Sequence, residues 1–210
     1  MVTAMNQFFR ENGKRGFDLV IATTTAVILL PVIISVAVLV RWRLGSPVLF
    51  KQPRGGLHGR HFTLFKFRSM TNARGSDGHF LSDEKRLTPT GQMIRKWSLD
   101  ELPQLWNVII GDMSLVGPRP LYTSYLERYS TEQSRRHETR PGITGWAQIN
   151  GRNAISWEER FRLDVWYVDH RSLWLDLKIL ALTALRVLLR RGISAEGHAT
   201  MTEFTGTNSP

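Results

Sequence analysis

Two adjacent carboxylates, Asp100 and Glu101, stand within the stretch WSLDELPQL (97–105) of a chain that is otherwise strongly basic. One interpretation is structural. Ser98 and Glu101 fit the S-x-x-E capping box, in which each side chain satisfies a free backbone N–H at a helix start. The other interpretation is chemical, because an acidic pair surrounded by basic residues suits a reaction at an anionic group. These nine residues alone leave both interpretations open.

Adjacent carboxylates at a helix start can divide two tasks in phosphoryl chemistry. One can hold Mg²⁺, which takes few protein carboxylates and completes its coordination with phosphate oxygens and water. The other can attack phosphorus, as aspartyl-phosphate enzymes do. An anionic nucleophile and a diphosphate repel each other, so the reaction also needs arginines, for which the candidates are Arg95, Arg119 and Arg152. Their positive charge should lower the pKa of Asp100 and keep it ionised.

The composition narrows the chemistry further. The 210 residues include 28 Lys and Arg against 18 Asp and Glu, and the net charge of +10 favours anionic partners: phosphorylated substrates, anionic lipid or nucleic acid. The absence of cysteine excludes disulfides, thiolate zinc sites and cysteine nucleophiles. The histidines show no H-E-x-x-H spacing, and no serine occupies a G-x-S-x-G elbow. The acidic pair is therefore the main candidate for catalysis.

An apolar segment near the N-terminus, Leu19 to Val40, runs for 22 residues without a charge. As one helix it would extend roughly 33 Å, enough to cross a hydrocarbon core of about 30 Å. However, Pro31 removes a backbone hydrogen bond in its middle, and basic residues flank both ends, which favours placing both ends on the cytoplasmic side. A re-entrant helix–break–helix satisfies both facts, while a kinked transmembrane helix is the alternative.

The rest of the chain predicts a mainly helical α+β domain with a small β element. The short β-like runs 48–50 and 62–67, separated by the glycine-rich RGGLHGR, indicate a hairpin. A polar loop is expected over 72–83 and an irregular, glycine-rich loop that carries Arg152 over 141–153. Helices are predicted at 87–97, 103–110, 121–137, 157–167 and 173–191.

The predicted organisation has three parts. Residues 1–44 hold the N-terminal segment and the membrane helix, and residues 45–192 form the catalytic domain. The last helix of that domain is so apolar that it suits either a buried core or a membrane interface. Residues 193–210 form a polar C-terminal tail that we expect to be loosely ordered.

Six motifs along the chain together resemble one family, the monotopic phosphoglycosyl transferases or bacterial sugar transferases. The resemblance runs from about residue 14 to residue 192, and within it Leu30 departs from the serine that members often have before the kink proline. The small size and the tail ISAEGHATMTEF are most similar to the bacillosamine-type initiating transferases of protein N-glycosylation. The motifs are KRGFD (14–18), the apolar run broken by Pro31, FKFRSM (65–70), SLDELPQLWNV (98–108), GDMSLVGPRP (111–120) and RPGITGWAQINGRN (140–153).

This resemblance implies a reaction and a role for each matched residue. The family transfers a sugar phosphate from a UDP-sugar to undecaprenyl phosphate, giving undecaprenyl-diphosphate sugar and UMP, the first membrane step of glycoconjugate assembly. Asp100 falls on its nucleophile, which forms a covalent glycosyl-phosphoryl aspartate in a ping-pong reaction, and Glu101 falls on its Mg²⁺ ligand. Arg119 and Arg152 fall on phosphate contacts, and Pro31 on the kink of its re-entrant helix.

The family also implies a location, the bacterial inner membrane with the catalytic domain on the cytoplasmic face and interfacial amphipathic helices beside it. Two alternatives remain. The same transfer could proceed by direct displacement without a covalent step, or the chain could be a non-catalytic, basic, membrane-anchored binding protein. A nucleic-acid partner is not expected, because no recognition-helix or RNA-binding motif occurs.

Overall fold

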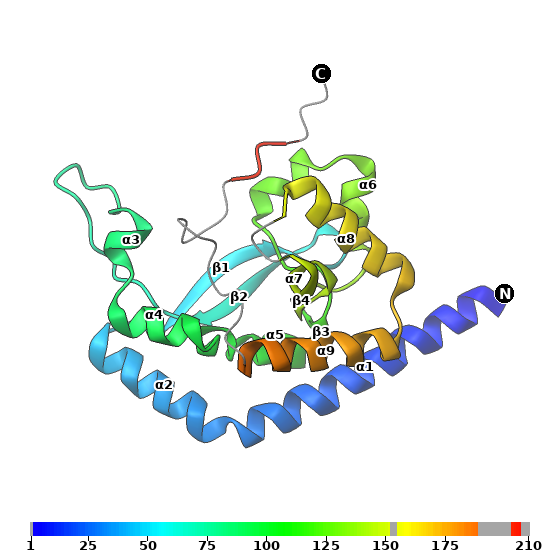
Figure 1. Ribbon diagram of the computed structural model, residues 1–210, viewed down its shortest axis with the longest axis horizontal. Coiled ribbons are helices and arrows are strands. Elements are labelled where there is room, and N and C mark those ends of the chain that lie inside the picture. Colours follow the sequence, from blue (N-terminus) through cyan, green and yellow to red (C-terminus); the bar gives the residue numbers. More distant parts are fainter. Residues whose placement is uncertain (1, 152–154, 189–202, 207–210) are drawn as a thin grey trace.

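The computed structural model describes residues 2–151, 155–188 and 203–206, and these are mainly helical with two small sheets (Figure 1). The longer helices are α1 (Val2–Ile28), α2 (Leu30–Arg43), α4 (Pro89–Lys96), α5 (Gln104–Ile110), α8 (Trp157–His170) and α9 (Leu173–Leu188). Shorter helices are α3 (Asp83–Arg86), α6 (Thr131–Ser134), α7 (Trp146–Asn150) and the 3₁₀ turns η1 (Leu57–Gly59), η2 (Leu99–Glu101), η3 (Thr123–Arg128) and η4 (Arg135–Glu138). The strands are β1 (Leu49–Gly55), β2 (His61–Phe67), β3 (Ser114–Val116) and β4 (Gly142–Thr144).

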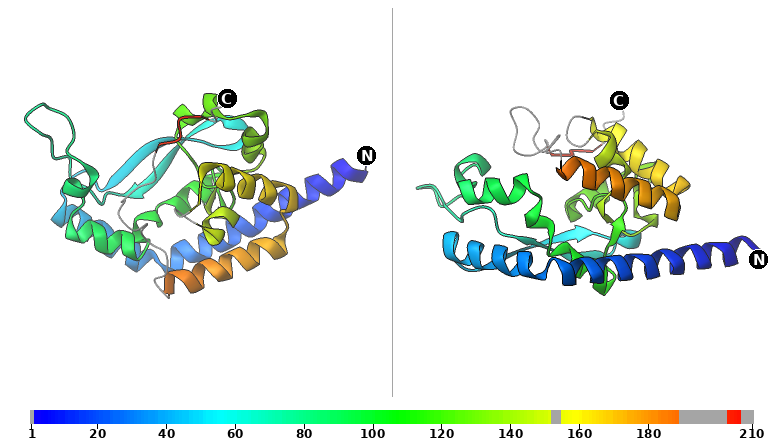
Figure 2. Two further views of the ribbon diagram at one scale, coloured as in Figure 1. Left: turned by 45° about the horizontal axis from the view of Figure 1, so that its top comes forward. Right: turned by 60° about the horizontal axis from the view of Figure 1, so that its bottom comes forward.

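The N-terminal helices α1 and α2 form a bent pair along one side of the molecule (Figures 1 and 2). They meet at 62°, with Leu29 between them and Pro31 in the first turn of α2. Proline has no N–H, so the helical hydrogen bond from residue 31 to the Val27 carbonyl is missing at the bend. One turn later, the hydroxyl of Ser35 donates to the carbonyl of Pro31 at 2.8 Å. The predicted helix–break–helix is therefore confirmed. In the described residues only this bent pair, and no single helix, has the length and apolar composition of a membrane span.

The KRGFD motif attaches α1 to the rest of the fold through buried polar contacts. The ammonium of Lys14 lies 2.6 Å from Asp176 of α9, whose carboxylate also accepts a hydrogen bond from the Tyr167 hydroxyl at 2.6 Å. Asp18 accepts a hydrogen bond from the Leu115 N–H at 3.2 Å. Because both carboxylates are almost fully buried, these partners are needed to offset the cost of removing their charge from water.

The same motif also fixes α5, the helix that follows the acidic pair. Arg15 donates to the carbonyls of Val108 and Ile109 at 2.6 and 2.8 Å. These carbonyls lie in the last turn of α5, where the helix supplies few donors: the Val108 carbonyl also accepts from the Gly111 N–H at 3.1 Å, and Arg15 adds its guanidinium to both. A cation there also suits the helix dipole. The N-terminal helix thus holds the segment that carries the candidate site.

The described residues also form two small two-stranded sheets. Strands β1 and β2 pair antiparallel from Leu49–Phe67 to Gly55–His61, which confirms the predicted hairpin, and η1 forms its turn. Strands β3 and β4 pair in parallel at the centre of the core. A Cβ on Gly142 would lie 2.0 Å from the Gly117 nitrogen, so the two strands can approach this closely only because residue 142 is glycine.

Three predicted elements differ from the structure. The helix expected over 121–137 is broken into η3, α6 and η4, because Ser130 and Gln133 form a capping box that starts a new helix. The helix expected over 87–97 begins only at Pro89, where the Thr88 side chain caps it. The segment 141–153, expected to be irregular, contains β4 and α7, whereas the loop over 72–82 has the predicted irregular form.

Candidate active site

The acidic pair lies in the 3₁₀ turn η2, which follows α4 directly. Ser98 precedes this turn with φ of 54°, in the left-handed region, and its side chain makes no capping hydrogen bond. The Glu101 side chain points instead toward two cations from other elements. The capping-box interpretation of these residues is therefore wrong, and the turn presents both carboxylates to a site assembled from distant segments.

Glu101 is held by two basic side chains. Its Oε1 atom lies 2.8 Å from the ammonium of Lys66 on β2 and 2.7 Å from the guanidinium of Arg119. Burial alone would raise the pKa of Glu101, but the charges and hydrogen bonds of Arg119 and Lys66 outweigh it and hold that pKa well below its usual range. Glu101 is thus a permanent anion in a fixed position.

Asp100 is in a different electrostatic environment. It is only 8% exposed, and burial, followed by the negative charge of Glu101, raises its pKa. Lys66, Arg95 and Arg119 oppose this effect without cancelling it, so the expectation that basic surroundings would lower the pKa of Asp100 is wrong.

The Asp100 carboxylate also keeps its lone pairs available. Its Oδ2 atom lies 3.7 Å from the Lys66 ammonium, and it accepts no hydrogen bond from the described part of the chain. An ionised carboxylate in this position is destabilised by its surroundings and gains by bonding to an electrophile or a cation.

The predicted phosphate-binding arginines are only partly brought together. Arg119 contacts Glu101 directly, and the prolines on either side restrict its backbone. Arg95, in the last turn of α4, acts on Asp100 through its charge while its Nε donates to the Ser69 hydroxyl at 2.9 Å. Arg152 lies outside the described residues.

Three further basic residues, one beside the acidic pair and two close enough to Arg119 to act on its charge, were not assigned a role from the sequence. Lys66 contacts both carboxylates and belongs to the FKFRSM motif, which was the available signal. Burial lowers the pKa of Arg160 to about 10, and Arg119 adds to this effect while Asp164 opposes it. Burial likewise lowers the pKa of Arg54, again with a contribution from Arg119. Basic charge is therefore concentrated around Arg119, as an anionic substrate requires.

The donor atoms of the pair suit magnesium. Mg²⁺ is bound in proteins through one or two carboxylates, with phosphate oxygens and water in its other positions. Asp100 and Glu101 supply such oxygens, and no hydrogen bond from the described residues reaches Oε2 of Glu101. Within those residues no cluster of three or more acidic or histidine ligands occurs, so a metal here would depend on the substrate for further ligands.

Comparison with known proteins gives consistent results. A profile of the family described as bacterial sugar transferase matches residues 9–190. The chain is 59% identical over 194 residues to an uncharacterized sugar transferase, EpsL, of Bacillus subtilis, covering 92% of this chain and 96% of that protein. It is also 41% identical to a UDP-galactose-lipid carrier transferase of Erwinia amylovora and to a UDP-glucose:undecaprenyl-phosphate glucose-1-phosphate transferase of Xanthomonas campestris. The chain covers only 41% and 38% of the length of these two proteins, respectively.

Proposed function

The chain belongs to the bacterial sugar transferase family of phosphoglycosyl transferases, and we propose that it transfers a sugar phosphate from a UDP-sugar to undecaprenyl phosphate. The products are undecaprenyl-diphosphate sugar and UMP. One observation carries this proposal: a single turn presents Asp100, whose carboxylate accepts no hydrogen bond from the described residues, beside Glu101, which Lys66 and Arg119 hold in place. A binding protein without catalysis has no need of this arrangement.

In the proposed reaction, an Asp100 carboxylate oxygen attacks the β-phosphorus of the UDP-sugar. The new O–P bond forms as the bond from that phosphorus to the bridging oxygen breaks, and UMP leaves with the bridging oxygen and its electron pair. A glycosyl-phosphoryl aspartate remains. An oxygen of undecaprenyl phosphate then attacks the same phosphorus and displaces Asp100 as a free carboxylate. The enzyme is unchanged at the end of the two steps.

The surrounding basic residues favour both steps. Arg119 and Lys66 place positive charge beside the diphosphate, where they offset its repulsion of the Asp100 carboxylate. Arg95 adds positive charge from α4, and Arg152 is proposed as a further phosphate contact from the family motif. Glu101, with Asp100 adjacent, would hold Mg²⁺, which supplies charge neutralisation at the phosphate oxygens.

The acceptor is a lipid, and the apolar surface of the molecule is suited to meeting it. The bent pair exposes Val27, Ile28 and Ile34 together with Trp42, which is 75% exposed. Trp106 of α5 and Trp174 of α9, the latter 79% exposed, are further exposed tryptophans. Tryptophan is enriched where apolar and wet environments meet. We therefore place α1 and α2 as a re-entrant pair in the cytoplasmic leaflet of the bacterial inner membrane, with α5 and α9 at its interface.

Intact-mass spectrometry tests the covalent step. The protein in detergent is incubated with UDP-sugar and Mg²⁺ but without lipid acceptor. A sugar-phosphate adduct is expected on the unaltered chain and on Asp77→Asn, a control in the exposed loop, but not on Asp100→Asn. If no adduct forms, and UMP release requires the lipid acceptor from the first turnover, direct displacement replaces the covalent mechanism.

The donor sugar is tested separately. The bacillosamine-type resemblance favours a UDP-linked 2-acetamido sugar. UMP release is measured across a panel of UDP-sugars with polyprenyl phosphate present. Strict preference for UDP-glucose or UDP-galactose would contradict the 2-acetamido assignment without affecting the class of reaction.

A further inference from the structure

The backbone of Arg119 is held by a second arginine that does not enter the candidate site. Arg136, on η4, donates from its NH2 group to the carbonyl oxygen of Arg119 at 2.7 Å. Backbone hydrogen bonds hold the stretch on either side of Arg119, where the Pro118 carbonyl accepts from the Gly142 N–H at 3.0 Å and the Leu121 carbonyl accepts from the Gly55 N–H at 3.2 Å. The prolines next to Arg119 have no N–H groups to add to these bonds. The Arg136 contact acts on Arg119 itself, between these two points, and so helps to set the position from which the Arg119 side chain reaches Glu101.

Arg136 is itself built into the protein interior. It is 2% exposed, and its Nε and NH2 groups donate to one oxygen of Asp164 on α8 at 3.2 and 2.8 Å. Its NH1 group donates to the Tyr129 hydroxyl at 3.2 Å. A guanidinium can make these contacts simultaneously because its donors lie in one rigid plane, which a lysine ammonium cannot reproduce. The cost of removing both charges from water offsets much of the attraction in a buried ion pair, so the pair adds little net stability. Its main effect here is to hold the Arg136 guanidinium in one position.

The C-terminal segment closes the aromatic enclosure around Arg136. The guanidinium lies 5.7 Å from the Tyr129 ring centre and 5.6 Å from that of Phe161. Phe204 packs on both rings, with centres 5.9 and 5.0 Å away, and is only 4% exposed. The tail was expected to be loosely ordered, but Glu203–Phe204 is docked, because Arg128 binds the Glu203 carboxylate and the Phe204 carbonyl.

We propose that Arg136 is a positioning residue for Arg119 and that Phe204 supports it, so that the C-terminal tail contributes to the geometry of the site. The described contacts run without interruption from Phe204 through Tyr129 and Phe161 to Arg136, then to the Arg119 backbone and on to Glu101. The proposal rests on the proposed function, since the group being positioned is a phosphate contact of that reaction.

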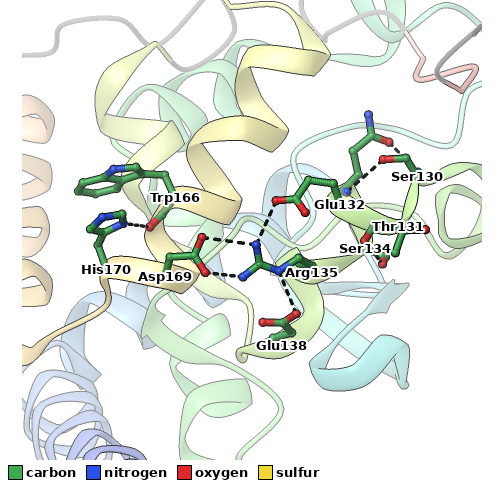
Figure 3. Close-up of polar contacts among 10 residues, drawn as sticks. Ser130, Thr131, Glu132, Ser134, Arg135, Glu138, Trp166, Asp169 and His170 are labelled. Carbon is green, nitrogen blue, oxygen red and sulfur yellow. Dashed lines mark hydrogen bonds and ion pairs between the residues drawn. The ribbon is translucent and has the colours of Figure 1, made fainter.

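The adjacent residue provides a matched control. Arg135 also joins η4 to α8, but on the protein surface, where it pairs with Asp169 and with Glu132 and Glu138 of its own segment (Figure 3). Arg135→Gln therefore weakens the same helix attachment without touching Arg119. Arg136→Lys keeps a positive charge beside Asp164 but removes the guanidinium plane, and Phe204→Ala removes the tail contact alone.

Two measurements on the full chain separate positioning from general stability. Hydrogen–deuterium exchange followed by mass spectrometry reports on the peptide that spans residues 117–122. Arg136→Lys should speed exchange there and Phe204→Ala should do so to a smaller extent, while Arg135→Gln should leave it unchanged. UMP release should show a kcat roughly a hundredfold lower for Arg136→Lys, because small displacements of a catalytic group have effects of this size.

A double-mutant cycle then decides whether Arg136 acts through Arg119. In the Arg119→Ala background, adding Arg136→Lys should cause little further loss, because the residue that it positions is already absent. Equal losses in both backgrounds, or unchanged exchange over 117–122, would overturn the proposal. If Arg136→Lys no longer unfolds cooperatively, the same cycle with Phe204→Ala decides in its place. An unaltered chain without transfer activity would overturn the proposed function, and the exchange comparison would still decide the positioning of Arg119.

Discussion

The ammonium of Lys66, on strand β2, lies 2.8 Å from Oε1 of Glu101, so the central hairpin is joined directly to a turn 35 residues away in sequence. The same ammonium lies 3.7 Å from Asp100. One cation therefore contacts both members of the acidic pair. This arrangement reduces the repulsion between two adjacent carboxylates, and within the part of the chain that the structure describes no hydrogen bond occupies the Asp100 oxygens.

This geometry predicts that Lys66 is required for turnover. Lys66→Met should lower kcat by about a hundredfold, because it removes a charge placed beside the reacting phosphate. Lys51→Met is the matched control, since Lys51 is exposed on the partner strand of the same hairpin. The measurement is steady-state UMP release. Equal activities of the two variants would contradict a role for Lys66 in the site.

The attachment of α1 predicts a large effect on stability. Lys14→Met leaves the buried carboxylate of Asp176 without its cation, so the free energy of unfolding should fall by about 3 kcal/mol. Lys178→Met, on the exposed face of the same helix α9, should change it by less than about 0.5 kcal/mol. Denaturant unfolding in detergent compares the two variants. A similar small change for both would show that the Lys14 contact does not hold α1 in place.

The sequence predicted a structural feature correctly where the residues that cause the feature lie close to it in the chain. The kink at Pro31 and the hairpin turn at Gly55–Gly59 are confirmed, because a proline inside an apolar run and clustered glycines act on their own neighbourhood. The helix expected over 121–137 was wrong, because a capping box at Ser130 overrides the average helical preference of the segment.

The candidate site was predictable only in part, because it is assembled over long distances. The acidic pair could be found from residue types alone, but the Lys66 contact depends on how β2 packs against η2. The direction of the Asp100 pKa was missed, because burial, which the sequence does not give, outweighs the nearby basic residues. The docking of Phe204 was missed because its partners lie about forty to eighty residues earlier in the chain.

A half-buried histidine predicts how stability depends on pH. Burial, reinforced by the charge of Arg136, lowers the pKa of His137 to about 4, although its hydrogen bond to the Gly56 carbonyl opposes this shift. In the unfolded chain His137 takes up a proton as the pH falls below about 6.5, whereas in the folded chain it stays neutral until about pH 4. The contribution of His137 to the free energy of unfolding is therefore fully present above pH 6.5. It decreases as the pH falls toward 4, by at most about 1.4 kcal/mol per pH unit.

Unfolding by denaturant at pH 7 and pH 5 measures this effect. The loss of stability between the two should be smaller in His137→Gln, which cannot take up the proton. His79→Gln, in the exposed loop, should show the same loss as the unaltered chain. An unchanged pH dependence in His137→Gln would assign the effect to other groups.

The bend at Pro31 predicts the topology of the N-terminal segment in a membrane. Since the chain has no cysteine, Asn6→Cys and Ser82→Cys each introduce one thiol, one before and one after the apolar segment Leu19 to Val40. If the pair is re-entrant, both thiols should react equally with a membrane-impermeant reagent in oriented vesicles. Opposite reactivity would mean that the segment crosses the bilayer. Pro31→Ala restores the missing N–H and favours one straight helix, so in that background the two thiols should become accessible from opposite sides.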